Sequence, residues 1–153
     1  LLGPGTGLGM SGLVPIPNGR FSALSGEGGH ATLAATNASE ATLIGILREQ
    51  FGHVSAERVL SGSGLVNLYG AVCTMDGVPP RVLRPSDVTD EAIAGSDPQC
   101  IATVRFFAGF LGSVAGNLAL TLGALGGVYV GGGIVPRLGA AFDASAGLVI
   151  SKA

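Results

Sequence analysis

Apolar residues at the start of the chain are interrupted by glycine and proline at short intervals. The stretch from Leu13 to Pro17 is apolar, contains β-branched residues and is broken by proline, which excludes a helix. The residues Pro17-Asn18-Gly19-Arg20 predict a turn, and Arg20 to Leu24 predict the returning strand. The chain is therefore expected to begin with short strands joined by tight turns.

A helical spacing of apolar residues follows this hairpin. Asn37, with Glu40 three residues later, predicts a capping box, and the helix that it opens is expected to end at Gly52. A second helix is predicted from a cap at Ser63 to about Met75. The middle of the chain is thus expected to be a helical block.

The next segment contains a loop and two further predicted helices. Residues 76–86 hold three prolines and no apolar period, which indicates a surface loop. Residues 89–91 (Thr-Asp-Glu) predict the cap of a brief helix. Asp97 followed by Pro98 is a strong helix start, and the apolar residues beyond it predict a long helix to about Leu122.

In the last part of the chain, the sequence predicts a strand, a glycine-rich turn and a helix. Residues 126–130 (Gly-Gly-Val-Tyr-Val) predict a buried strand, three glycines at 131–133 predict a turn, and Pro136 is expected to begin a helix to about Ala144. A hairpin, a helical block, a strand and a helix form an α/β layer arrangement rather than a helical bundle.

Composition and charge narrow the classes of protein. The 153 residues suit one domain, 47% are hydrophobic and only 12% are charged, and the 27 glycines lie among apolar residues. Net charge is −2 and the basic residues are scattered, so we expect no nucleic-acid partner. Cys73 and Cys100 lack metal-ligand spacing, and a reducing cytoplasm is the expected compartment.

One uncharged run raises a membrane alternative. From Phe106 to Val130 there is no charged residue, and about 20 residues can cross a bilayer. Asn117 lies within this run, a pair of glycines at 126–127 breaks a helix there, and the flanks lack clustered basic residues. A buried helix feeding a buried strand explains the run as well, so we expect no membrane partner.

Glycine at every second position from Gly3 to Gly9 is the first candidate binding element. Residues 7–12 match a dinucleotide fingerprint, but that fingerprint must open a helix, and the apolar, proline-broken sequel cannot form one. A glycine-rich turn between strands can instead expose backbone N–H groups to an anion, with the hydroxyl of Thr6 beside them. A plain glycine-rich hairpin is the simpler alternative.

Glu27 and His30 are the second candidate, because only glycines separate these two polar side chains. Together they offer the acceptors and donors that suit the hydroxyls of a sugar. Glu57 lies in a short helical turn capped by Ser55, where a carboxylate also complements the helix dipole. The simpler alternative is a solvated turn and a helix-end charge.

Four motifs in combination resemble the bacterial-type glucokinase family. They are GPGTGLG at 3–9, GEGGH at 26–30, GHVSAERVLSG at 52–62 and GGVYVGGGIVPR at 126–137. Their spacing also matches, so the resemblance covers roughly residues 1–143. The zinc-binding cysteine cluster of the other bacterial sugar-kinase group, the repressor/kinase family, is absent from the sequence, which favours the glucokinase branch.

The resemblance implies an actin-like/ribonuclease H-like ATPase fold, with residues 1–153 as part of its large domain. It implies transfer of the γ-phosphoryl group of ATP, with Mg²⁺, to glucose, the first step of glycolysis. A homodimer is also expected. Under this resemblance the glucose-binding residues are Glu27, His30 and Glu57, the phosphate-binding turn is Gly5, Thr6 and Gly7, and the adenosine-binding turn is Gly131, Gly132 and Gly133.

The chain departs from the family pattern at the catalytic base. That base is the Asp of an Asn-Asp pair, which occurs nowhere in this sequence, and the Asp-x-Gly-Gly-Thr phosphate loop is also absent. After about Asp143 the sequence drifts from the pattern, without the expected closing helix. We therefore expect a fragment with no catalytic residue, inactive alone. A non-catalytic sugar- or nucleotide-binding regulator of the same fold is the alternative function.

Overall fold

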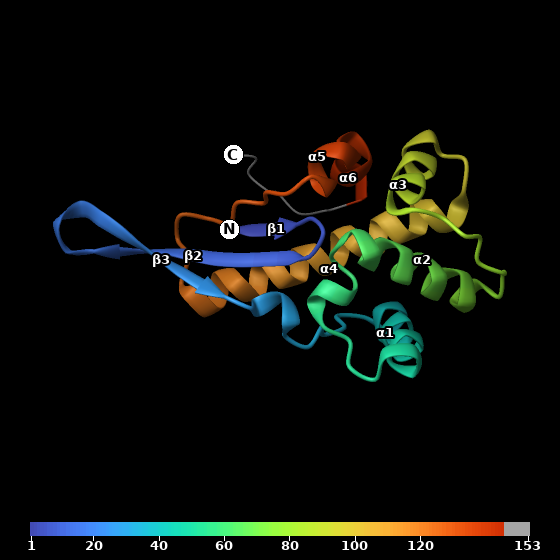
Figure 1. Ribbon diagram of the computed structural model, residues 1–153, viewed down its shortest axis with the longest axis horizontal. Helices are drawn as coiled ribbons and strands as arrows, with labels where there is room; N and C mark the ends of the chain where they lie inside the picture. The colour runs from blue at the N-terminus through green and yellow to red at the C-terminus, as the bar shows by residue number, and fades with distance from the viewer. Residues whose placement is uncertain (146–153) are drawn as a thin grey trace.

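The computed structural model describes residues 1–145 and contains one antiparallel sheet beside a block of helices (Figure 1). The sheet has the order β1 (Leu2–Pro4), β2 (Leu8–Ile16) and β3 (Arg20–Gly26). Leu13 pairs with Ala23 across the second hairpin. The two hairpins confirm the strands predicted from the start of the sequence. The far end of the β2–β3 hairpin extends beyond α4 (Figure 1).

Six α-helices and three short 3₁₀ turns are described. The helices are α1 (Ala38–Phe51), α2 (Gly62–Asp76), α3 (Pro85–Ala94), α4 (Pro98–Leu122), α5 (Ile134–Leu138) and α6 (Ala140–Ser145); the turns are η1 (Pro17–Gly19), η2 (Gly28–His30) and η3 (Ala56–Arg58).

The core lies where α4 meets α2, α3 and α6, and where α1 packs on α2. Phe107 and Phe110 of α4 are fully buried, as are Leu2 of β1 and Leu65 of α2. Each such side chain contributes about 1.5–3 kcal/mol by leaving water. The sheet is joined to this core mainly through its first two strands, because all seven residues of β3 are exposed.

The predicted start and end of α1 are confirmed. The Asn37 side chain accepts from the N–H of Glu40 at 3.0 Å, and Gly52 ends the helix at φ 71°. The Glu40 carboxylate accepts from the N–H and the hydroxyl of Thr36, one residue before the cap, at 2.7 and 2.8 Å. The buried Glu40 therefore forms the reciprocal half of the capping box with Thr36 rather than with the cap residue Asn37.

Two predicted helix starts are wrong by a few residues. Helix α2 is capped by Ser61, whose hydroxyl accepts from the N–H of Gly64 at 3.0 Å, and Ser63 lies inside the first turn. Helix α3 begins at Pro85, with the Arg84 N–H donating to Asp87 at 2.9 Å, so Thr89 lies within the helix and is buried. At α2 the upstream serine supplies the cap, whereas α3 starts at a proline and Asp87 in its first turn accepts the preceding N–H.

The strand predicted at 126–130 is not buried and hardly forms. Val130 makes a single parallel bridge to Leu2, and Tyr129 is exposed. The predicted helix from Pro136 to Ala144 is instead two short helices, because Gly139 at φ 48° ends α5 before α6 begins. Glycine permits the positive φ that breaks the helix there.

Helix α4 confirms the predicted span from Asp97–Pro98 to Leu122. Within the described residues it is one helix whose length and apolar composition would allow it to cross a membrane. Val104 and Leu111 on its inner face are buried against the neighbouring helices. The core helix of a globular domain passes the same test, and toward the end of α4 Leu120 and Leu122 are exposed.

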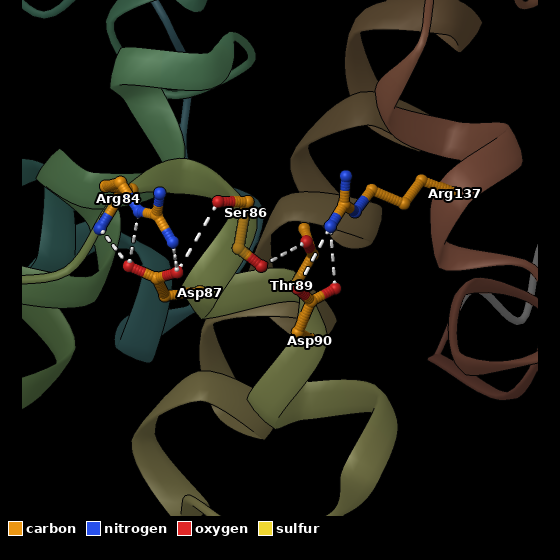
Figure 2. Close-up of polar contacts among 6 residues, drawn as sticks. All are labelled: Arg84, Ser86, Asp87, Thr89, Asp90 and Arg137. Atoms are coloured by element: carbon orange, nitrogen blue, oxygen red, sulfur yellow. Dashed lines mark hydrogen bonds and ion pairs between the residues drawn. The ribbon is translucent and has the colours of Figure 1, made fainter.

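One ion pair joins α5 to α3, and a second lies at the start of α3 (Figure 2). Arg137 of α5 donates to both carboxylate oxygens of Asp90 in α3, at 2.8 and 2.9 Å. Arg84 donates to both oxygens of Asp87 at the start of α3, and the Thr89 hydroxyl donates to the carbonyl of Ser86. These contacts tie the start and middle of α3 in place.

Candidate functional site

A pocket of about 340 Å³ opens where η2, η3 and the ends of two helices meet. Residues far apart in the sequence line it, and most of them are polar. They are His30, Phe51, His53, Ser55, Glu57, Arg58 and Ser63. Its size and polar lining suit a small hydrophilic molecule.

Backbone pairing between two loops builds this pocket. The N–H of Leu33 donates to the carbonyl of Val54 at 3.0 Å, and the N–H of Ala56 donates to the carbonyl of Ala31 at 2.9 Å. The two loops thus run side by side, one just after His30 and the other just before Glu57. The pairing brings two predicted site residues to one cavity.

Glu27 lies at the rim rather than in the pocket lining. Its Oε2 is 3.7 Å from Nε2 of His30, and the two side chains are 91% and 62% exposed. The turn is tight because the N–H of His30 donates to the carbonyl of Glu27 at 3.0 Å. A Cβ on Gly29 would lie 2.3 Å from the carbonyl oxygen of Leu8, so this turn requires glycine where it approaches β2.

Glu57 has a partner that no pattern in the sequence predicted. Its Oε2 accepts the backbone N–H of Leu8 at 2.8 Å, across 49 positions of sequence. A Cβ on Gly7 would lie 2.6 Å from the same oxygen. The carboxylate therefore lies directly against the first glycine turn and is more than a helix-end charge.

Five lining residues were not predicted from the sequence as site residues: Phe51, His53, Ser55, Arg58 and Ser63. Arg58 places its guanidinium 4.6 Å from the centre of the Phe51 ring, a cation–π contact. The Nε2 of His53 lies 3.0 Å from the hydroxyl of Thr32. His53 and Arg58 flank Glu57 within the motif at 52–62, and that proximity was the available signal.

The first glycine turn is fixed to α2 and to itself. The N–H of Gly5 donates to the carbonyl of Gly7, and the N–H of Gly62, at the start of α2, donates to the carbonyl of Gly5, both at 2.8 Å. Within residues 1–145 the Thr6 hydroxyl has no hydrogen-bond partner. The turn is thus held in shape while Thr6 faces solvent.

The second glycine turn lies against the first. The N–H of Gly131 donates to the carbonyl of Leu2 at 2.8 Å. Gly132 has φ +80°, and a Cβ there would lie 2.2 Å from the carbonyl oxygen of Pro4, next to Gly5. Gly133 begins α5 as its cap residue. The structure therefore brings together the two turns that the sequence placed more than 120 residues apart.

A separate polar cluster lies between α3 and α4. Ligating atoms of Glu91, Asp97 and Cys100 lie within 4.8 Å of one another, but Arg81 donates to both carboxylates. Burial raises the pKa of Cys100 to about 12, and the neighbouring Asp97 adds to the shift. The cluster therefore already contains a cation, and its thiol is protonated at neutral pH.

Solved structures define the class of this fold. The glucokinase of an Antarctic psychrotroph superposes with a TM-score of 0.86 at 42% identity, covering 92% of this chain and 44% of that one. The glucokinase of Balamuthia mandrillaris, in a complex with glucose, superposes with a TM-score of 0.76 at 22% identity, covering 94% and 44%. This is the actin-like fold of sugar kinases, as the sequence resemblance implied.

Sequence relatives identify the family within this class of fold. A family model described as glucokinase matches residues 1–148. The glucokinase of Aromatoleum aromaticum is 57% identical over 145 residues, which cover 95% of this chain and 44% of that protein. The chain belongs to the glucokinase family. It spans less than half the length of the curated relatives that it matches.

Proposed function

We propose that this chain is the large-domain portion of an enzyme that transfers the γ-phosphoryl group of ATP to glucose, giving glucose 6-phosphate. The observation that carries the proposal is the meeting of Glu57 with His30 in one pocket, while the same Glu57 contacts the glycine turn at Leu8. A sugar site must lie beside a phosphate site for this transfer. Membership of the glucokinase family supports the same assignment.

In this proposal Glu27, His30 and Glu57 bind glucose. Carboxylate oxygens accept hydrogen bonds from sugar hydroxyls, and the imidazole of His30 can donate or accept. Glu57 has two oxygens, and Leu8 occupies one side of Oε2, which leaves Oε1 for a hydroxyl in the pocket. Glu27, at the rim, would close over the sugar from its exposed position.

ATP is assigned to the two glycine turns, with the phosphates at Gly5, Thr6 and Gly7 and the adenosine at Gly131, Gly132 and Gly133. Two observations support this assignment: the Gly132 backbone packs on the Pro4 carbonyl, so the two turns lie side by side, and the Thr6 hydroxyl has no hydrogen-bond partner within residues 1–145. Mg²⁺ is proposed to arrive with ATP, because this ion is bound mainly by phosphates and water. When bound, it neutralises charge on the phosphates.

The catalytic base is proposed to lie outside these 153 residues, because the sequence contains no Asn-Asp pair. In this proposal the role of the chain is to orient the sugar beside the phosphate turn. We expect no phosphorylation by the chain alone. A coupled assay giving glucose 6-phosphate at ordinary enzyme rates would contradict that. Several further points stay predictions from the sequence. They are a role in glycolysis, a cytoplasmic location, a homodimer, and the absence of membrane and nucleic-acid partners.

The test of the sugar site is a thermal-shift titration with glucose, with sorbitol as the control polyol. Binding to the folded state raises the midpoint with ligand concentration. We expect a saturable rise with glucose that Glu57→Ala reduces strongly. A clean unfolding transition that glucose leaves unchanged at every concentration would contradict the sugar assignment.

A further inference from the structure

The contact between Glu57 and the first glycine turn goes beyond sugar binding. Oε2 of Glu57 accepts the N–H of Leu8 at 2.8 Å, at the point where the turn becomes β2. At the other side of the turn, Gly5 accepts the N–H of Gly62 at 2.8 Å. The turn is therefore fastened at both sides to the η3–α2 segment, once by backbone and once by the Glu57 side chain.

The absence of a side chain at Gly7 makes room for this contact. A Cβ there would approach Oε2 of Glu57 to 2.6 Å, a distance that such atoms do not adopt without a shift. The neighbour that would have to move is the far end of a flexible side chain rather than backbone. Gly7→Ala is therefore expected to leave the fold intact and to displace the Glu57 carboxylate from the turn.

We propose that Glu57 is a positioning residue for the phosphate turn, holding the Gly7–Leu8 backbone in the shape that binds ATP while its second oxygen faces the sugar pocket. The inference rests on the proposed function, since it takes the turn as the phosphate site. One side chain then links the two substrate sites, and a sugar that orders Glu57 also orders the turn.

The conservative variant separates the two roles of Glu57. In Glu57→Gln the amide oxygen can still accept the N–H of Leu8, but the charge that favours sugar hydroxyls is lost. In Glu57→Ala both functions are lost. A residue needed only for stability would lower the unfolding midpoint in both variants without separating the two affinities.

The experiment is calorimetric titration of the chain with ATP in the absence of sugar, well below the unfolding midpoint. We expect Glu57→Ala and Gly7→Ala each to weaken ATP binding about fivefold, and Glu57→Gln to stay within about twofold of the unmodified chain. Glu49→Ala removes an equally charged, exposed carboxylate on α1 and is the matched control, expected to bind ATP normally. The double variant Gly7→Ala/Glu57→Ala should be no weaker than either single variant, because both remove the same contact.

The outcomes separate this inference from the sugar assignment. Unchanged ATP affinity in Glu57→Ala or additive losses in the double variant would each overturn the inference alone. No ATP binding by the unmodified chain would overturn the ATP assignment of the proposed function, and the inference with it. ATP affinities that follow the expected order in a chain that ignores glucose would support Glu57 as the positioning residue and overturn the sugar site. Normal glucose binding, with an ATP affinity that does not change in the Glu57 variants, would support the sugar site and overturn Glu57 as the positioning residue.

Discussion

Helix α2 connects two regions that use polar side chains in opposite ways. Beyond its C-terminal end, Arg81 donates to Glu91 and Asp97, and Arg84 donates to Asp87. At its N-terminal end, Arg58 lies over an aromatic ring and has no carboxylate partner within the described residues. The first region pairs its arginines with carboxylates, and the second leaves polar groups facing a pocket.

The difference shows which polar groups serve the fold and which are available to a ligand. A paired side chain gains little from a small molecule, because binding would replace contacts that it already has. In the pocket, the His30 side chain is 62% exposed and Oε1 of Glu57 accepts no hydrogen bond within residues 1–145, so a ligand at these two groups replaces mainly water. Variants in the paired region should therefore change stability and leave ligand affinity alone, and variants at the pocket should do the opposite.

Removing a cap in the paired region should have the largest effect. Asp97 accepts the N–H of Cys100 at 2.7 Å at the start of α4 and also receives Arg81. Asp97→Ala should lower the free energy of unfolding by about 2 kcal/mol, measured by urea denaturation. Asp97→Asn keeps the capping oxygen and should lose less than half as much. Weaker glucose binding with unchanged stability would break the contrast between the two regions.

A pocket substitution should change affinity more than stability. His30 is 62% exposed, so His30→Ala removes little buried surface, but it takes away the hydrogen bond that we propose His30 makes to a sugar hydroxyl. We expect about a fivefold loss of glucose affinity in a thermal-shift titration. His30→Gln, which keeps a donor and an acceptor, should recover part of it. A lower unfolding midpoint with unchanged glucose affinity would show that His30 stabilises the fold, as the side chains of the paired region do.

Acid should weaken the paired region. Hydrogen bonds from Arg84 hold the pKa of Asp87 at about 2, below its ordinary value of 3.8. Because the folded pKa is the lower one, Asp87 stabilises the fold above about pH 4, and this contribution is lost as the pH falls toward 2. In a series of urea denaturations between pH 5 and 2, Asp87→Asn should show a shallower loss of stability. An identical slope in both proteins would exclude this role.

The smallest effect is expected from a thiol probe. With its pKa raised to about 12 by burial, Cys100 holds about a thousandfold less thiolate than an ordinary thiol of pKa 9 at the same pH. Iodoacetamide at pH 8 should leave Cys100 unmodified in the folded chain and label it in urea, as read by mass spectrometry. Rapid labelling of the folded chain would show that the paired region opens.

Local signals predicted most elements because their causes lie within a few residues. The Asn37 and Asp97 caps and the end of α1 at Gly52 were predicted and confirmed. Predictions failed where two local signals competed, as with Ser61 and Ser63. They also failed at 126–130, where an apolar run depends for burial on neighbours that the sequence does not place.

In the candidate site, too, some features follow from the sequence alone and others depend on tertiary structure. The sequence determined the residue types: a Glu and a His separated by glycines, a Glu in a capped turn, and two glycine-rich turns with their family motifs. Tertiary structure decided that Glu57 reaches Leu8, that Gly132 packs on Pro4 and that Glu27 stays at the rim. Such contacts join residues dozens of positions apart, so they depend on how the whole chain packs, and no local periodicity encodes them.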